Sequence, residues 1–303
     1  MIAYTAPSRT NAANLTWLNE FSSDIIPVAC HSHNDYMRRV PLYEGLAADC
    51  MCTKADIWSR NSSLSAGQAD LLVGHTSKAL AESRTLRSLY LDPLMNILGH
   101  KNEAENALSP RGVFSMAPNN SLVLLLDFKT SDDTPWDSVV AQLGPFRKND
   151  WLTYWSSTAG VVQRPSTVVA SGDAPFDTII SNSTYRDIFY DAPIAKLSEP
   201  NNPYNSNNSY YASGSLREAV RRTSFGHLSD KQKDMIKSQI ETSKALGLKS
   251  RYWDTPSWPI SFRNRIWTAL EELGTDMLNI DDLTAVTRWD WDMCIVGGIA
   301  VCD

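Results

Sequence analysis

Short apolar runs that end on a charged or polar residue recur along this chain, and they constrain its fold more than any other feature. The clearest is Leu122–Asp127, in which five apolar residues (LVLLL) precede the carboxylate of Asp127. A continuous apolar run of this length is typical of a parallel strand that is covered on both faces. Segments with apolar residues three to four positions apart separate the runs and are typical of amphipathic helices. The alternation indicates an α/β fold with a parallel sheet.

The runs predict strands in the following order: Val28–Asp35, Cys50–Ile57, Leu71–Val73, Leu122–Asp127, Thr167–Ala170, Ile188–Tyr190, Lys249–Trp253 and Met277–Ile280. Helices are predicted from Pro41, from Thr85 to Leu98 with a kink at Pro93, from Thr134, from Ser229 to Gly247, and from Phe262 to Gly274. Glu199–Ser215 is rich in Asn, Ser and Tyr, so it is expected to be a polar loop or lid with a short strand at Tyr210–Ala212.

Strand and helix alternate seven or eight times, which predicts a (β/α)₈ TIM barrel. A chain of 303 residues suits this fold, which typically needs about 250. An open doubly wound sheet is the alternative, although no glycine-rich dinucleotide fingerprint follows the first strand. We expect one domain over residues 1–303, with the barrel core at about 25–287.

The net charge and the cysteine content limit which partners and which cellular compartment are expected. A net charge of −6 without a basic run argues against nucleic acid and anionic membrane surfaces as partners. The first residues lack the pattern of a signal peptide or a membrane span. Five cysteines form an odd, sparse set, so reduced thiols in a cytoplasmic protein are expected. Five glycosylation sequons, at Asn14, Asn61, Asn119, Asn182 and Asn207, leave a secreted mature form as the alternative.

Titratable residues gather at the predicted strand ends, which a barrel brings together at one mouth. This set comprises His31, His33, Asp56, His75, Asp127, Lys129, Asp254 and Asp281. Two histidines across a pocket can move a proton from a nucleophile and to a leaving group. Carboxylates can bind a divalent cation, and lysine adds fixed positive charge. The set therefore predicts an acid–base site suited to phosphodiester cleavage.

Several segments resemble the fungal altered inheritance of mitochondria protein 6 family, of the phospholipase C-like phosphodiesterase superfamily. They are His31–Tyr36 (HSHNDY), Ala55–Trp58 (ADIW), Leu72–Thr76 (LVGHT), Arg84–Leu94 (RTLRSLYLDPL), Leu126–Lys129 (LDFK), Tyr252–Pro256 (YWDTP) and Asn279–Leu283 (NIDDL). The resemblance implies a phosphodiesterase-type barrel in which His31 and His75 are the acid–base pair. It also implies that Asp56 and Asp127 match Mg²⁺ ligands and that Lys129 matches a site lysine.

One position departs from the superfamily pattern. Members usually carry Glu-x-Asp on the second strand, whereas this chain has Lys54-Ala55-Asp56. An ammonium at a metal-ligand position should weaken Mg²⁺ binding or abolish it. Lys54 could point away, replace the metal as a built-in cation, or act as a base or Schiff-base nucleophile.

Three functions follow from this reasoning, each with a small-molecule partner. The first is phosphodiester cleavage with His31 and His75 as acid and base, together with Lys54 and Lys129. The second is a repurposed metal-independent cyclase, lyase or isomerase that acts on a metabolite of secondary metabolism. The third is a non-catalytic binding protein. The residues expected to contact the substrate are His33, Asn34, Asp35, Trp58, Trp253, Asp254 and Asp281. The oligomeric state is left open.

Overall fold

In a computed structural model of the protein, eight parallel strands close into a barrel. The structure describes residues 21–59, 70–103, 109–130, 133–221, 223–291, 295–296 and 299–300. The barrel strands are β1 (Val28–Ser32), β2 (Cys50–Trp58), β4 (Leu122–Phe128), β7 (Ser166–Gly172), β9 (Ile188–Pro193), β10 (Ser209–Ser215), β11 (Lys249–Trp253) and β12 (Met277–Ile280). Their order is β1-β12-β11-β10-β9-β7-β4-β2, and β2 pairs with β1 to close the ring. The predicted (β/α)₈ barrel is confirmed.

Helices follow the strands and cover the outside of the barrel. They are α1 (Pro41–Ala47), α2 (Asp92–Lys101), α3 (Asp133–Gln142), α4 (Gly144–Lys148), α5 (Phe176–Ser181), α6 (Leu216–Val220), α7 (Asp230–Ala245), α8 (Ile260–Glu272) and α9 (Leu283–Val286). Helix α7 begins where the sequence predicts, because Ser229 and Gln232 form a capping box. A π-helical turn, Arg87–Leu91, leads into α2 just before Pro93. Each helix within the described ranges is too short or too polar to cross a membrane.

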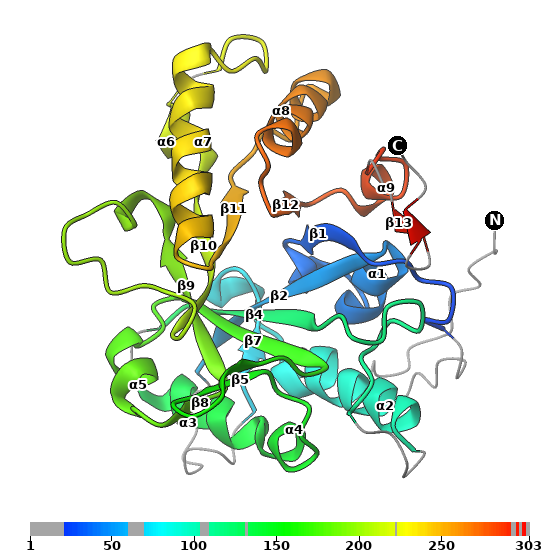
Figure 1. The fold of residues 1–303 in the computed structure, drawn as a ribbon. Helices are drawn as coiled ribbons and strands as arrows, with labels where there is room; N and C mark the ends of the chain where they lie inside the picture. The colour runs from blue at the N-terminus through cyan, green and yellow to red at the C-terminus, as the bar shows by residue number, and fades with distance from the viewer. Residues whose placement is uncertain are drawn as a thin grey trace.

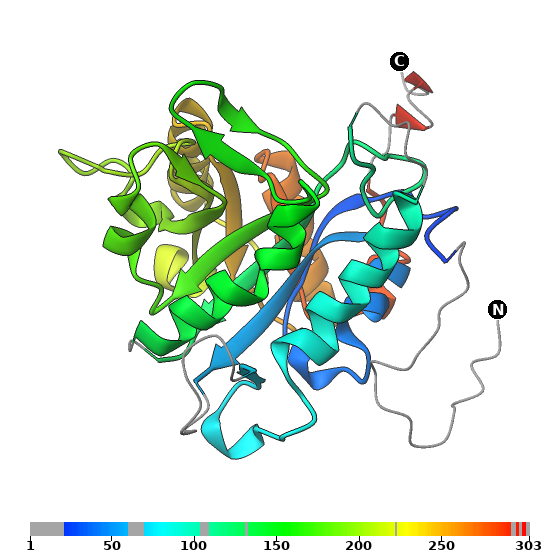
Figure 2. The same ribbon diagram turned by 90° about the horizontal axis from the view of Figure 1, so that it is seen from below.

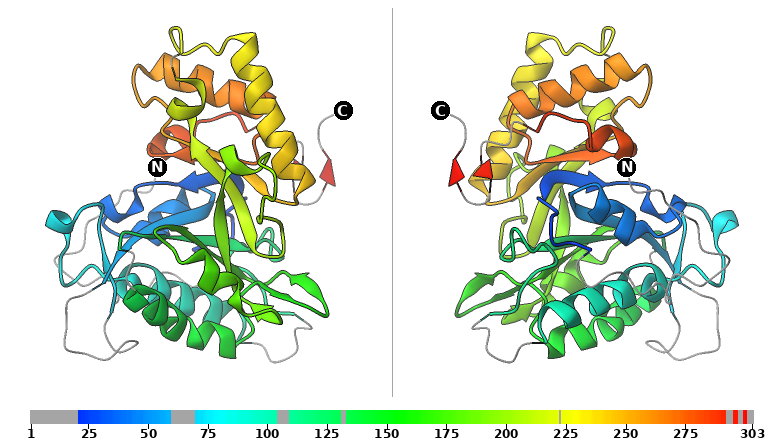
Figure 3. Two further views of the ribbon diagram at one scale, coloured as in Figure 1. Left: turned by 90° about the vertical axis from the view of Figure 1, so that its left-hand side faces the viewer. Right: turned by 90° about the vertical axis from the view of Figure 1, so that its right-hand side faces the viewer.

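The apolar packing divides into two outer clusters and one inner cluster. One outer cluster joins β2 and β4 to α2 and α3, and the other joins β10, β11 and β12 to α7 and α8. Accordingly, α7 and α8 lie on the opposite side of the molecule from α2 and α3 (Figures 1 and 3). Figure 2 shows the strands enclosed between these groups of helices. The inner cluster includes Val123, Leu125 and Tyr211, so the barrel is filled by side chains rather than open.

Alternation along each strand determines which residues reach the mouth. On β4, Leu124 and Leu126 face the outer cluster, whereas Val123 and Leu125 face inward. Asp127 continues the inward series because side chains alternate with a period of two. Asp56 on β2 pairs in register with Asp127, so the two carboxylates reach the mouth at the same level.

Two expectations about chain segments are corrected. The short strand predicted at Tyr210–Ala212 is confirmed, but it extends over Ser209–Ser215 as the barrel strand β10, with Tyr211 fully buried, so the loop is shorter than predicted. The small polar residues of β10 look like a loop although they pack inside the barrel. The apolar run near Leu72 forms β3 (Leu72–Val73), which pairs antiparallel with the end of β2 and is not one of the barrel strands.

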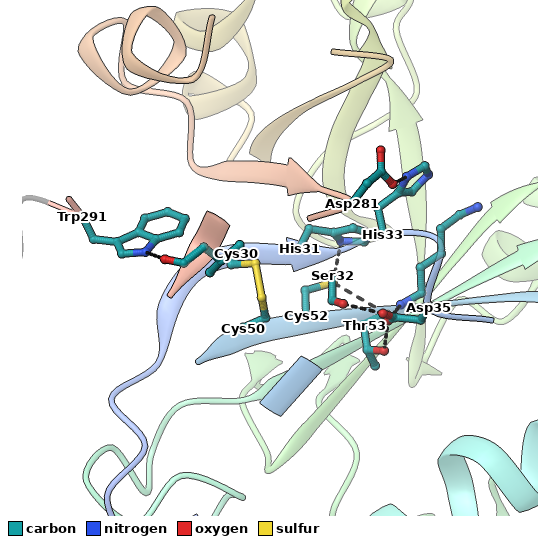
Figure 4. Close-up of a disulfide and its surroundings, with 12 residues drawn as sticks. Cys30, His31, Ser32, His33, Asp35, Cys50, Cys52, Thr53, Asp281 and Trp291 are labelled. Carbon is teal, nitrogen blue, oxygen red and sulfur yellow. Dashed lines mark hydrogen bonds and ion pairs between the residues drawn. A yellow bond between two sulfur atoms is a disulfide. The ribbon is translucent and has the colours of Figure 1, made fainter. Parts of the chain in front are cut away.

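The expectation of reduced cysteines is wrong for two of them. Cys30 on β1 and Cys50 on β2 form a buried disulfide across a sequence separation of 20 residues. Figure 4 places it at the opposite end of these strands from His33 and Asp281. Cys52 is a buried free thiol, and Cys294 and Cys302 lie outside the described residues.

We expect the Cys30–Cys50 disulfide to stabilise the barrel by restricting the unfolded chain. For a loop of this length, the double variant C30S/C50S should lose about 3 kcal/mol of unfolding free energy, measured by denaturant unfolding. Reductant should destabilise the parent protein but leave the variant unchanged, which is the control. Equal stability of parent and variant would contradict the prediction.

Candidate active site

Two lysines and two aspartates form a compact charge cluster at the mouth of the barrel. Lys54 Nζ contacts the carboxylate of Asp56 and lies 2.7 Å from Asp127 Oδ2. Lys129 Nζ lies 2.8 Å from Asp127 Oδ2 and 3.3 Å from Asp56 Oδ2. Asp56 is fully buried and the Lys54 side chain is only 8% exposed. Each carboxylate is therefore shared by both ammonium groups, and the formal charges of the cluster cancel.

The pKa shifts in this cluster follow from the same pairing. Burial acts to raise the pKa of Asp127, but the charges of Lys54 and Lys129 outweigh burial and lower it. Burial acts to lower the pKa of Lys129, but Asp127 and Asp56 outweigh burial and raise it. Lys129 is thus held as an ammonium and supplies charge rather than a base.

The close packing of β7 against this cluster requires a glycine. Gly172 ends β7 with a φ of +68°, and a Cβ there would lie 2.2 Å from Asp127 Oδ1. A larger residue would therefore displace the Asp127 carboxylate from the lysines.

A chain of contacts links the charge cluster to two histidines. His75 Nδ1 lies 3.2 Å from Asp56 Oδ2, and its ring stacks on Tyr36 with the ring centroids 5.5 Å apart. The Tyr36 hydroxyl donates to Asn34, whose amide donates to Asp281 Oδ1 at 2.7 Å. The same carboxylate oxygen lies 2.7 Å from His33 Nδ1. Both histidines therefore use Nδ1 to bind a carboxylate, so each Nε2 is directed away from it.

The structure distinguishes the two histidines of β1 and its following residues. His31 is fully buried, its Nδ1 lies 2.7 Å from Cys52 Sγ, and its ring packs edge-on against Tyr211. Burial, then the charge of Arg251, lowers the pKa of His31 well below its usual value. His33 lies two residues further along, at the level of Asp281 (Figure 4). The mouth position expected for His31 is occupied by His33.

Asp35, expected to contact substrate, is used inside the protein. It is fully buried and accepts hydrogen bonds from Ser32, Thr53 and the Lys54 amide, and it pairs with Arg38. Burial raises its pKa to about 6 despite these partners. Asp35 therefore fixes the backbone that carries Lys54.

Sequence reasoning missed a buried network beneath the mouth. Arg251 on β11 lies 2.9 Å from Asp191 Oδ2 on β9 and donates to Ser213 on β10 and Asn279 on β12. One guanidinium thus ties four consecutive strands together from inside. The sequence signal that could have revealed this network is a charged residue, Arg251, inside the predicted strand Lys249–Trp253. Arg38 and Tyr36 were also missed as site residues, although both follow the HSHND stretch closely.

The remaining predicted residues lie at strand ends but outside the charge cluster. The Trp58 indole donates to the Gly74 carbonyl at 2.5 Å, next to His75. Trp253 ends β11 with 38% of its surface exposed. Asp254 accepts hydrogen bonds from Arg217 at 2.7 Å and from Ser215 at 3.1 Å. It therefore secures the start of α6.

The residues present do not fit the Mg²⁺ that the superfamily pattern implies. The two carboxylates at ligand positions, Asp56 and Asp127, are both paired with the Lys54 ammonium. A cation already stands between the oxygens that would bind the metal. Within the described part of the chain, no group of three or more His, Cys, Asp or Glu side chains is arranged to hold a metal ion.

These features define an α/β barrel that carries histidine, lysine and aspartate side chains around the carboxyl ends of its strands, where barrel enzymes have their active sites. An AIM6-like phosphodiesterase domain matches residues 19–191. The chain is 36% identical to the altered inheritance of mitochondria protein 6 homolog of Arthroderma benhamiae, covering 86% of this chain and 83% of that protein. It is 35% identical to altered inheritance of mitochondria protein 6 of Eremothecium gossypii, and the match covers 86% of this chain and 68% of that protein. It is 32% identical to altered inheritance of mitochondria protein 6 of Saccharomyces cerevisiae, and the match covers 87% of this chain and 71% of that protein. The chain belongs to the altered inheritance of mitochondria protein 6 family and is phosphodiesterase-like.

We expect the pKa of His33 to depend on Asp281. Burial lowers this pKa below 6.5, whereas the hydrogen bond and charge of Asp281 raise it. Asp281→Asn removes the opposing charge, so the His33 pKa should fall further, as measured by NMR titration of the imidazole. The surface His100, paired with Glu103 at 3.4 Å, is the internal control and should not move. A His33 pKa that stays constant or rises would contradict the assignment.

Proposed function

We propose that this protein is a metal-independent acid–base enzyme that cleaves a small phosphodiester at the barrel mouth. The observation that carries the proposal is the arrangement of His33 and His75 around the lysine–aspartate cluster. Each histidine is anchored through Nδ1 to a carboxylate, Asp281 or Asp56. Membership of a phosphodiesterase-like family supports the reaction class.

The two histidines would have different roles. His33 has a lowered pKa and is neutral near pH 7, so its Nε2 would accept the proton of the attacking hydroxyl. The attacking oxygen forms a new bond to phosphorus as the bond to the leaving oxygen breaks. His75, whose side chain is 62% exposed, would donate a proton to that leaving oxygen. The attacking group is water or a hydroxyl of the substrate, and the latter gives a cyclic phosphate.

The lysines supply charge in place of a metal. Lys129 is more exposed than Lys54 and is held as an ammonium, so it would meet the phosphate oxygens. Lys54 keeps Asp56 and Asp127 neutralised and in place. A Schiff-base role for Lys54 is disfavoured because its Nζ contacts two carboxylates, a pairing suited to an ammonium.

A second candidate function rests on the neutrality of the cluster. Two ammonium groups and two carboxylates cancel, so the mouth has no strong net attraction for a phosphate. Cyclisation, elimination or isomerisation of an uncharged metabolite by the same histidines would suit this charge balance. Trp58 and Trp253 at the strand ends would provide aromatic contacts for such a substrate.

We expect His33→Ala and His75→Ala each to reduce turnover by about 10²- to 10⁴-fold, because each removes one proton-transfer group. The assay is a panel of glycerophosphodiesters, lysophospholipids, cyclic phosphodiesters and uncharged aromatic metabolites, with chelator present throughout. His100→Ala, at the end of α2, is the matched control. Full activity of the His33 variant would overturn its role, and turnover of only uncharged metabolites would favour the second function.

We expect the parent protein not to bind Mg²⁺ and the variant Lys54→Glu to bind it. The substitution replaces the ammonium by a third carboxylate beside Asp56 and Asp127. Titration calorimetry should show Mg²⁺ binding to Lys54→Glu alone, and Mg²⁺ should raise the melting temperature of that variant. Lys54→Met, which removes the charge without adding a ligand, is the control. Binding of Mg²⁺ by the parent would contradict the assignment of Lys54 as the cation that stands in place of the metal.

A further inference from the structure

Three glycosylation sequons lie in the described part of the chain, and all three have an exposed acceptor asparagine in irregular structure. They are Asn119-Asn120-Ser121, Asn182-Ser183-Thr184 and Asn207-Asn208-Ser209. Two further sequons, at Asn14 and Asn61, lie outside the described residues. An exposed asparagine outside helices and strands is the local setting that N-linked glycosylation requires.

The three acceptors share one face of the barrel. Asn119 precedes β4, Asn182 precedes β9 and Asn207 precedes β10, each by a few residues. They therefore lie at the amino ends of the strands, whereas His33, Asp56 and Asp127 lie at the carboxyl ends. Arg186 connects two of the acceptor loops by donating to the carbonyls of Asn207 at 2.7 Å and Asn182 at 2.8 Å. Glycans on this face would leave the mouth open to substrate.

The contacts at Asn182 engage one side of its amide. Its Oδ1 accepts from the backbone N–H of Thr184 at 3.0 Å and from the Thr184 hydroxyl at 2.9 Å. Both contacts use the amide oxygen, so the turn of the sequon does not require the nitrogen to which a sugar would be attached.

The disulfide gives independent support for a secretory route. Cys30 and Cys50 are joined inside the barrel, and such bonds form and persist in oxidising compartments such as the secretory lumen. N-linked glycosylation requires the same route. The disulfide and the sequons are separate features, and both indicate that the chain passes through the secretory route.

We propose that Asn119, Asn182 and Asn207 carry N-linked glycans on the face opposite the catalytic mouth. In each transfer, the asparagine Nδ2 attacks the anomeric carbon of a lipid diphosphate-linked oligosaccharide. A carbon–nitrogen bond forms, the carbon–oxygen bond to the diphosphate breaks, the amide loses one proton, and the lipid diphosphate leaves with the electron pair. Disulfide formation is separate, since a protein disulfide oxidant takes two electrons and two protons from Cys30 and Cys50.

The test is glycopeptide mapping of the protein purified from its native source. Release by peptide:N-glycosidase in oxygen-18 water should convert Asn119, Asn182 and Asn207 to labelled aspartate. Asn149, which is exposed but outside any sequon, should remain asparagine. If one of the three asparagines carries no glycan, the proposal fails for that site. If all three are unmodified, the whole proposal is overturned.

A pair of variants separates glycosylation from folding. Thr184→Ser keeps the sequon and should keep the glycan on Asn182. Thr184→Ala destroys the sequon and should lower the mass of the intact protein by one glycan. Both variants should leave turnover unchanged, because Thr184 precedes β9 at the amino ends of the barrel strands, whereas the mouth lies at the carboxyl ends. Equal masses for the two variants would overturn the assignment of Asn182.

Discussion

A buried carboxylate is stable only if a cation or several hydrogen-bond donors stand beside it, and at this mouth the cation is the Lys54 ammonium. Lys54 contacts Asp56 and Asp127 at once, and Lys129 closes the cluster from the more exposed side. Asp56 can then also bind His75. The orientation of His75 thus depends on a lysine where the superfamily places a metal ligand.

Two buried charges outside the mouth support this arrangement. Asp35 accepts the Lys54 amide hydrogen and the Thr53 hydroxyl, which fixes β2 where Lys54 leaves it. Arg251 joins β9, β10, β11 and β12 from inside. Asn279, which binds Arg251, lies two residues before Asp281, the partner of His33. His33 and His75 lie just beyond β1 and β3, and each is positioned by a carboxylate, Asp281 just beyond β12 or Asp56 within β2.

The sequence predicts the fold well because its strands are short apolar runs and its helices have clear ends, such as Ser229 and Pro41. It fails where composition and environment disagree. Only Tyr210–Ala212 is predicted as a strand within Ser209–Ser215, because the small polar residues beside it resemble a loop, although Ser213 binds the buried Arg251. The disulfide was also missed, because an odd number of cysteines does not reveal which two strands lie side by side.

The sequence predicts which residues gather near the site, but not how deep in the barrel each of them lies. His31 and His33 lie on the same side of the chain, and a period of two cannot show which one reaches the mouth. Two residues correspond to about 6 to 7 Å along a strand, enough to separate a core position from a substrate contact. The register decides, since His31 pairs with Cys52 and Asn279, one layer below Lys54 and Asp281. His33 therefore lies at the level of Lys54 in the charge cluster. His31, which is neutral and fully buried, packs in the layer of side chains directly below it.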